Sequence, residues 1–111
     1  MAYRLNRQLV LEAPQRLPDG AGGFSESWVA LGIVWANVKA RTGREKAGVA
    51  APLSQVAYRI VVRAAPAGSD ARPQANQRFR EGQRYYRILT VAGDDADGRY
   101  LVCTSQEETV A

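Results

Sequence analysis

Three aspartates in the segment Asp94-Asp95-Ala96-Asp97-Gly98 have the spacing closest to a known metal-binding chemistry. Alternating carboxylates before a glycine begin the calcium loop of EF-hand proteins, which also needs a glutamate six residues after the glycine and flanking helices. Position 104 is a threonine, and the neighbouring residues favour strands. We therefore expect a solvated turn between two strands and no metal site.

The chain contains few side chains of the types that commonly act as nucleophiles or general bases in enzymes. It contains no histidine and one cysteine, Cys103, which excludes Ser-His-Asp and Cys-His catalysis and an ordinary four-ligand zinc site. Cys103 alternates with Leu101 along an apolar run, so we expect a buried structural thiol. Glu107 and Glu108 are adjacent near the end of the chain, where we expect both to be solvated. We expect no catalytic residues, no cofactor and no enzyme activity.

Tyrosines and arginines alternate in the last third of the sequence. The tyrosines are Tyr85, Tyr86 and Tyr100, and the arginines are Arg78, Arg80, Arg84, Arg87 and Arg99. On an OB-type barrel such residues could stack on the bases of single-stranded nucleic acid. Because Tyr86 would share a strand face with Ile88 and Arg84, the alternative is packing in a core or between subunits. Both interpretations stay open.

Charge is distributed unevenly along the chain, which has a net charge of +4. Residues 1–38 are neutral, residues 39–87 have eleven bases against three acids, and residues 88–111 have one base against five acids. Such a basic middle and acidic end favour head-to-tail contact between copies, or a polyanion on one side. The lone cysteine, and the lack of a signal-peptide core or an apolar stretch of about 18 residues, predict an intracellular protein that does not span a membrane.

Six short runs of apolar, β-branched and aromatic residues predict strands. They are residues 9–12, 24–41 with a kink at Gly32, 56–64, 77–80, 84–91 and 99–104. We expect Pro14 to end the first strand and to begin a loop. In the second strand, one face should contain Val34, Ala36 and Val38. Residues 106–111 are expected to form a frayed tail. We predict a mainly β fold: one domain over residues 1–111, forming a small antiparallel β-barrel of about six strands. A long loop or short helix, residues 42–55, is inserted after the second strand.

A series of motifs runs in order along residues 5–107. It consists of Asp19-Gly20 with Gly22-Gly23, Trp28, Val34-Trp35-Ala36-Asn37-Val38, Gly43-Arg44-Glu45, Tyr58-Arg59-Ile60-Val61-Val62-Arg63, Gly82 ahead of Tyr85-Tyr86-Arg87-Ile88, and Gly98-Arg99-Tyr100-Leu101 before Cys103 and Glu107. In this order the motifs resemble the head-tail joining family of tailed phages. These stopper or head-completion proteins also occur in phage-like gene transfer particles.

The resemblance implies a ring of six copies in the neck of a virion or phage-like particle, made in the cytoplasm of a bacterial host. The partners would be other copies of the chain, a portal-adaptor protein, a tail terminator protein and packaged double-stranded DNA, with no membrane. The family's channel loop maps onto residues 42–55, where Arg41, Arg44 and Lys46 would face DNA without reading its sequence.

Four aromatic residues are predicted to pack in the core or between subunits: Trp28, Trp35, Tyr58 and Tyr86. The predicted function is therefore a structural stopper that joins head to tail and helps retain DNA. The alternative is a non-specific nucleic-acid-binding barrel of the OB type.

Overall fold

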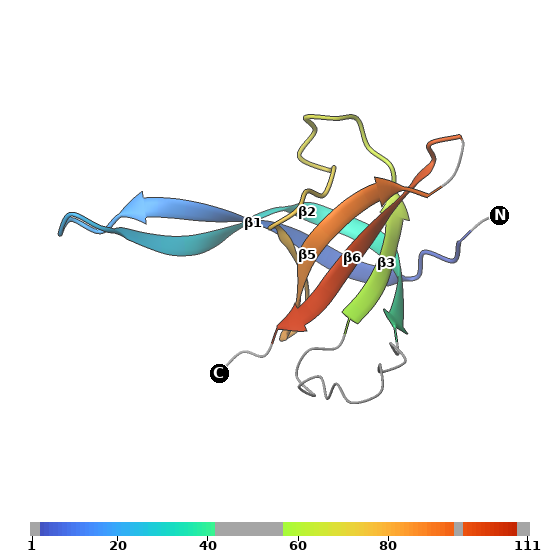
Figure 1. Ribbon diagram of the computed structural model, residues 1–111, viewed down its shortest axis with the longest axis horizontal. Helices are drawn as coiled ribbons and strands as arrows, with labels where there is room; N and C mark the ends of the chain where they lie inside the picture. Colours follow the sequence, from blue (N-terminus) through green and yellow to red (C-terminus); the bar gives the residue numbers. More distant parts are fainter. Residues whose placement is uncertain (1–2, 42–56, 95–96, 109–111) are drawn as a thin grey trace, which may run out of the picture.

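The computed structural model describes residues 3–41, 57–94 and 97–108. This part of the chain forms six strands: β1 (Arg7–Pro18), β2 (Phe24–Arg41), β3 (Ala57–Arg63), β4 (Arg78–Glu81), β5 (Arg84–Gly93) and β6 (Tyr100–Glu108). All neighbouring strands are antiparallel, and the order β1-β2-β3-β6-β5-β4 closes into a barrel (Figure 1). The mainly β prediction is confirmed. The insertion predicted at residues 42–55 lies outside the described residues.

The core lies inside this ring, where alternate residues of every strand point inward. Its buried members are Leu9, Leu11, Ala36, Ile60, Val62, Phe79, Tyr86, Ile88, Leu101 and Cys103. The predicted face of the second strand is confirmed, because Ala36 is fully buried and Val34 and Val38 pack against the core. The predicted burial of Cys103 is also confirmed, and burial raises the pKa of its thiol to about 12.

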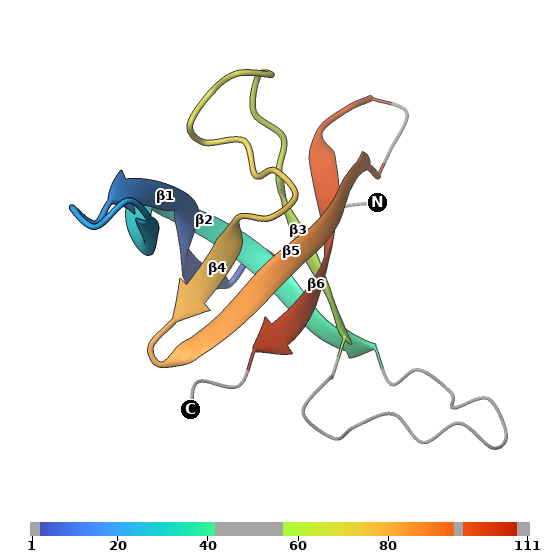
Figure 2. The same ribbon diagram turned by 60° about the vertical axis from the view of Figure 1, so that its left-hand side comes forward.

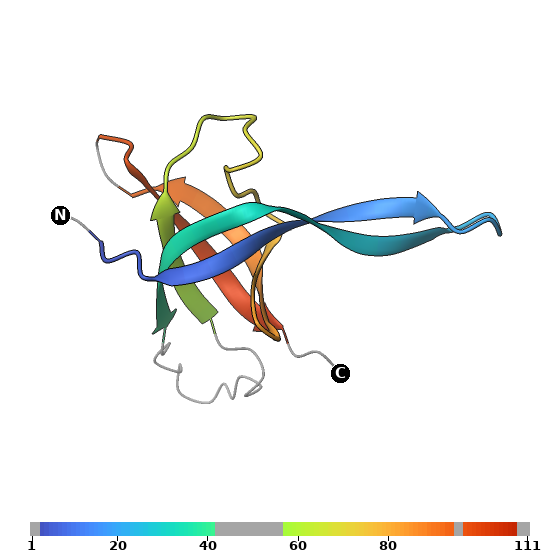
Figure 3. The ribbon, with the colours of Figure 1, turned by 180° about the vertical axis from the view of Figure 1, so that it is seen from behind.

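Strands β1 and β2 extend well beyond the ring as a two-stranded ribbon (Figures 1 and 3). Strand β4 pairs with β1 only at Val10–Glu12, and β3 pairs with β2 only from Ala36 onward. We call residues 13–30 the arm. The prediction that the first strand stops before Pro14 is wrong, since β1 continues to Pro18. Proline is tolerated there because one edge of this part of β1 has no partner strand, so no backbone N–H is needed on that side for a hydrogen bond.

A β-bulge marks the point where the arm leaves the ring. Leu11 pairs with Gly32 and Glu12 with Ala30, so Leu31 is the extra residue on β2. A bulge bends its strand and increases the local twist. The kink predicted at Gly32 is therefore confirmed. Figure 2 turns the arm toward the viewer and shows the remaining strands following one another around the ring.

The tip of the arm is a tight turn fixed by Asp19. Its carboxylate accepts hydrogen bonds from the backbone N–H groups of Ala21 and Gly23, at 2.8 and 3.0 Å. These bonds lower the pKa of Asp19. Gly20 and Gly22 have φ values of 81° and 87°, which side chains other than glycine rarely allow. The Asp-Gly and Gly-Gly pairs of the sequence thus build the turn that joins β1 to β2.

Candidate functional site

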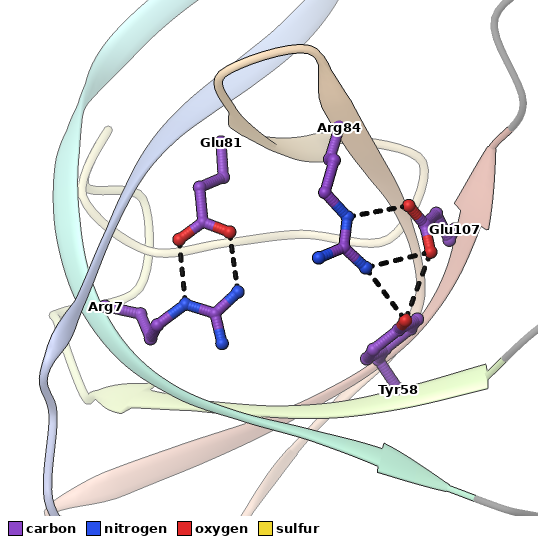
Figure 4. A network of polar contacts seen from close by, with 5 residues as sticks. All are labelled: Arg7, Tyr58, Glu81, Arg84 and Glu107. Carbon is purple, nitrogen blue, oxygen red and sulfur yellow. Dashed lines mark hydrogen bonds and ion pairs between the residues drawn. The ribbon is translucent and has the colours of Figure 1, made fainter.

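One end of the ring is closed by charged side chains that continue the inward pattern of the strands (Figure 4). They are Arg7, Tyr58, Glu81, Arg84 and Glu107, which we call the polar cap. Each lies two residues from a buried core residue on the same strand, for example Arg7 before Leu9 and Arg84 before Tyr86. The cap therefore occupies the end of the barrel interior where β2 ends and β3 begins.

Two ion pairs hold the polar cap together. Arg7 donates from Nε and Nη2 to the two carboxylate oxygens of Glu81, at 2.8 and 2.6 Å. Arg84 donates from Nε and Nη2 to Glu107, at 2.9 and 3.1 Å. The Tyr58 hydroxyl accepts from Arg84 at 2.9 Å and donates to Glu107 at 3.1 Å (Figure 4). The first pair joins β1 to β4, and the second group joins β3, β5 and β6.

The electrostatics of the cap favour fixed charges. Hydrogen bonds from Arg7 and Arg84 lower the pKa of Glu81 and of Glu107, and the bond to Glu107 raises the pKa of Arg84. Beneath them, burial raises the pKa of Tyr86. The two carboxylates and the two arginines of the cap therefore keep their usual charge at neutral pH, and each carboxylate is bound by an arginine. The cap is suited to closing and stiffening the ring end, not to proton transfer.

The acidic end of the sequence is paired within the chain, contrary to two of the expectations. Strand β6 continues to Glu108, so residues 106–108 are not frayed, and Glu107 is bound by Arg84. Glu108 pairs with Arg87 at 3.4 Å, and Asp94 accepts from Arg59 at 2.9 Å and from Tyr3. Antiparallel pairing of β6 with β5 and β3 places acids beside bases far apart in sequence. The opposed charges therefore stabilise the fold, and they do not by themselves indicate contact between copies.

A second cluster attaches the base of the arm to the ring. The Arg78 guanidinium lies between two aromatic rings, 4.0 Å from the centre of Trp28 and 4.2 Å from that of Tyr85. Buried Glu12 accepts from Nε of Arg78 at 2.7 Å and from Nε of Arg80 at 2.9 Å. Burial alone would raise the pKa of Glu12, but these hydrogen bonds outweigh it and lower the pKa. We call Glu12, Trp28, Arg78 and Tyr85 the arm clamp.

The two faces of the arm differ in charge. Residues directly opposite each other on an antiparallel pair point to the same face. One face combines Pro14, Arg16, Phe24, Glu26 and Trp28, and the Arg16 guanidinium lies 4.6 Å from the Phe24 ring centre. The other face contains Ala13, Gln15, Leu17, Ser25, Ser27 and Val29. This second face has no charged residue, and its Leu17 and Val29 are exposed.

An apolar hollow lies between β2 and the segment that follows β3, residues 64–71. It consists of two adjoining depressions of about 300 and 280 Å³ that share Ile33, Val34 and Ala71. Ile33 and Trp35 are exposed on the outer face of β2, at 60% and 53%. Arg63 lies in the lining of one depression and Asp70 in that of the other. The hollow is therefore mainly apolar, with one charge of each sign.

The predicted packing residues occupy different environments. Tyr86 is fully buried, and Tyr58 packs against the core, with its ring at 4.9 Å from that of Tyr86. Trp28 is in the arm clamp. Trp35 is not in the core, because it alternates with buried Ala36 and points outward, so only its predicted packing between subunits remains as a proposal.

The predicted DNA-facing residues are only partly described. Arg41 is exposed at the end of β2, whereas Arg44 and Lys46 lie outside the described residues. Their role therefore remains a prediction.

The three tyrosines do not form a stacking platform for bases. Tyr86 is in the core, and Tyr100 is 8% exposed, with its ring 5.1 Å from that of Tyr3. One face of the Tyr85 ring is occupied by Arg78. The predicted alternative, an OB-like nucleic-acid-binding barrel, thus lacks the aromatic surface on which it depended.

Sequence reasoning missed the arm and its exposed apolar residues. The signal for the uncharged face was present as alternation of Ala13, Gln15 and Leu17, which continues the alternation of buried Leu9 and Leu11. It was hidden because the prolines at positions 14 and 18 fall between these residues and indicate a loop.

The sequence model of the phage head completion protein family matches residues 1–108. The chain belongs to this family. Head completion proteins are structural, which agrees with the expectation that the chain is not an enzyme. A comparison with curated proteins finds no match. In the described part, no helix could span a membrane, and no group of three or more histidine, cysteine or acidic side chains could hold a metal ion.

Solved structures include two similar chains. A chain from the virion of a native gene transfer agent particle is 54% identical, with a TM-score of 0.81 over 99% of this chain and 100% of that chain. A protein of Shigella flexneri 2a, whose structure was determined in solution, is 20% identical. Its TM-score is 0.67 over 97% of this chain and 96% of its own, which shows the same fold. Both matches span almost the whole of each chain.

Proposed function

We propose that this head completion protein is a structural component of the neck of a gene transfer agent or phage-like particle. The observation that carries the proposal is the full-length similarity, at 54% identity, to a chain of a gene transfer agent virion. In the proposed assembly six copies form a stopper ring between a portal-adaptor protein and a tail terminator protein. The ring joins the head to the tail and helps retain packaged DNA.

The shape of the molecule supports a role in assembly. A ring subunit needs surfaces that contact other chains. The arm extends beyond the barrel and exposes Leu17 and Val29 on one face and Phe24 on the other. Exposed large apolar side chains are typical of protein interfaces. The polar cap, in contrast, satisfies its charges within the chain, so the barrel itself is complete without a partner.

Retention of DNA is assigned to the segment after β2. Exposed Arg41 ends this strand, and Arg44 and Lys46 follow it in the sequence. In a closed ring each base is repeated in every copy, so weak contacts with phosphates add together and weaken as salt increases. No sequence readout is expected from such contacts.

Deletion of the gene, followed by complementation, tests the structural role. Without the protein we expect separate heads and tails, counted by electron microscopy, and complementation should restore joined particles. Joined particles at normal numbers in the deletion strain would contradict the proposal.

Combined substitution of Arg44→Ser and Lys46→Ser tests the role in DNA retention. We expect more DNA leakage from tailless heads, with the largest difference from the unsubstituted protein at low salt, where contacts with phosphates are strongest. Arg4→Ser removes an exposed positive charge near the N-terminus, outside this segment, and serves as the control. Leakage equal to that of the unsubstituted protein at every salt concentration would exclude retention by these charges.

A further inference from the structure

We propose that the arm is a hinged element, which the arm clamp holds in one direction relative to the ring. The hinge is the β-bulge at Leu31, and the contact that holds the arm is the stacking of Trp28 on Arg78. With this stack closed, the arm and the ring move as one body, and opening the stack lets the arm swing. The inference concerns the single chain and does not depend on the proposed ring.

The junction between the arm and the ring has few neighbouring strands to support it (Figures 1 and 3). On β1, pairing with β4 ends at Glu12. Ahead of Ala36, β2 has β1 as its only partner strand among the described residues. A ribbon of two strands is marginally stable by itself. The bulge at Leu31 lies at this junction and interrupts the ladder, so the ribbon bends there more readily than elsewhere.

One side chain of the arm contacts two arginines of the ring. The centre of the Trp28 ring lies 4.0 Å from the guanidinium of Arg78 on β4 and 5.4 Å from that of Arg87 on β5. A cation over the face of a tryptophan is attracted by the ring, and the attraction increases when both groups are removed from water. These contacts join the arm to two strands that do not pair with it.

The Arg78 side chain is fixed from several sides, so it provides a firm surface for stacking. Its Nε donates to Glu12 at 2.7 Å, and the two side chains are 16% and 9% exposed. Tyr85 stacks on the same guanidinium at 4.2 Å. Because the hydrogen bond uses the edge of the planar guanidinium, its faces remain for the two aromatic rings. The position of Trp28 over this plane sets the direction in which the arm leaves the ring.

The stack lies outside the barrel core. Among the described residues, the core cluster and the side chains packed against it include no member of the arm, residues 13–30. Trp28 and Tyr85 are half-buried. The stack can therefore open while the ring stays folded, which distinguishes it from a contact needed for folding. A preset direction also lowers the entropy cost of any contact that the arm makes with another chain.

Distances between two spin labels in the isolated protein test this inference. The reference protein contains Ser25→Cys on the arm and Thr90→Cys on β5, two exposed positions. Native Cys103 is buried and does not take a label. Pulsed electron paramagnetic resonance measures the distribution of distances between the labels. We expect a single narrow distribution, because the arm clamp holds the arm in one direction.

Two substitutions in the stack are compared with one in the arm. Trp28→Ala removes the ring that stacks, and Arg78→Lys keeps the charge but has no plane to stack on. Both should cause loss of the single narrow distribution and give a broad one. Arg16→Gln is the matched control, since it removes the arm's own arginine–aromatic contact, with Phe24 at 4.6 Å. It should leave the distribution narrow.

A thermal melt of each variant shows whether the ring is folded. A broad distribution in the reference protein would overturn the inference, and so would a narrow one in either folded stack variant. Equal broadening by Arg16→Gln would show that the ribbon itself had changed, and would overturn it too. Failure of both stack variants to fold would make the stack a folding contact, which contradicts the inference.

Discussion

The ring and the arm are built from the same two strands, β1 and β2, yet they are stabilised in different ways. Within the ring each strand has two neighbours and an inner face buried in the core. Within the arm each strand pairs with the other, and beyond the contact of Trp28 with Arg78 the described residues place no further layer over either face. The difference indicates that the ring is stabilised by its own core, whereas a two-stranded ribbon such as the arm has little stability of its own.

The two phenylalanines of the chain provide the largest expected contrast between ring and arm. Phe79 is 0% exposed in the core and Phe24 is 60% exposed on the arm. We expect Phe79→Ala to lower the free energy of unfolding by about 3–5 kcal/mol, because it leaves a cavity. Phe24→Ala should change it by about 0.5 kcal/mol or less. Urea denaturation measures both, and similar losses would contradict the comparison.

Two glutamates test the arm clamp, where the two regions meet. Glu12 is buried and binds Arg78 and Arg80, whereas the structure gives Glu26, on the arm, no ion pair among the described residues. Glu12→Ala should lower the free energy of unfolding by about 1–3 kcal/mol, because it leaves two partly buried arginines without their acceptor. Glu26→Ala, the matched control, should lower it by less than about 0.5 kcal/mol in the same denaturation experiment. Equal effects would show that the clamp contributes nothing.

Acid should weaken the ring through its polar cap. The pKa values of Glu81 and Glu107 are lowered in the folded chain by hydrogen bonds from Arg7 and Arg84. A carboxyl group with a lowered pKa adds stability above its unfolded value, about 4.3, and that stability is lost as the pH falls. We expect the melting temperature to decrease between about pH 5 and pH 3.

Arg84→Gln should make this decrease smaller, because Glu107 then loses the group that lowers its pKa. Arg16→Gln is the matched control. The Arg16 guanidinium contacts the aromatic ring of Phe24, and it forms no ion pair with a carboxylate among the described residues. Thermal melts at several pH values provide the measurement. An unchanged pH profile in Arg84→Gln would show that the cap does not contribute.

The smallest expected effect on folding is at Trp35. Because this side chain is 53% exposed on the outside of β2, Trp35→Ala should change the free energy of unfolding by about 1 kcal/mol or less. The same substitution should reduce incorporation into particles, because Trp35 is proposed to pack between subunits. A loss of about 3 kcal/mol or more in the isolated protein would indicate that Trp35 has a core role.

Local patterns predicted the ring well. Alternation in residues 56–64 predicted β3, and the Val34, Ala36 and Val38 pattern predicted the inner face of β2. The outward position of Trp35 also follows from that alternation, but its size and apolarity favoured burial. Aromatic character alone does not distinguish a core from an uncovered surface.

Features that depend on pairing between distant residues could not be predicted. Glu107 was expected to be solvated because its partner Arg84 is 23 residues away in sequence, and register between β5 and β6 brings them together. Glu12 and Arg78 are 66 residues apart, so the arm clamp had no local signal. The arm itself was missed because pairing with β2 overrides the tendency of Pro14 and Pro18 to end a strand.

Those two prolines also affect how free copies behave before assembly. An open strand edge can recruit further strands and lead to uncontrolled aggregation. Beyond Glu12 the outer edge of β1 has no partner strand among the described residues, and Pro14 and Pro18 each remove one N–H donor from it. A strand from another molecule would leave acceptors unpaired at both positions, so stacking of arms edge to edge is disfavoured. The arm can therefore stay exposed and extended in the free protein without acting as a template for fibrils.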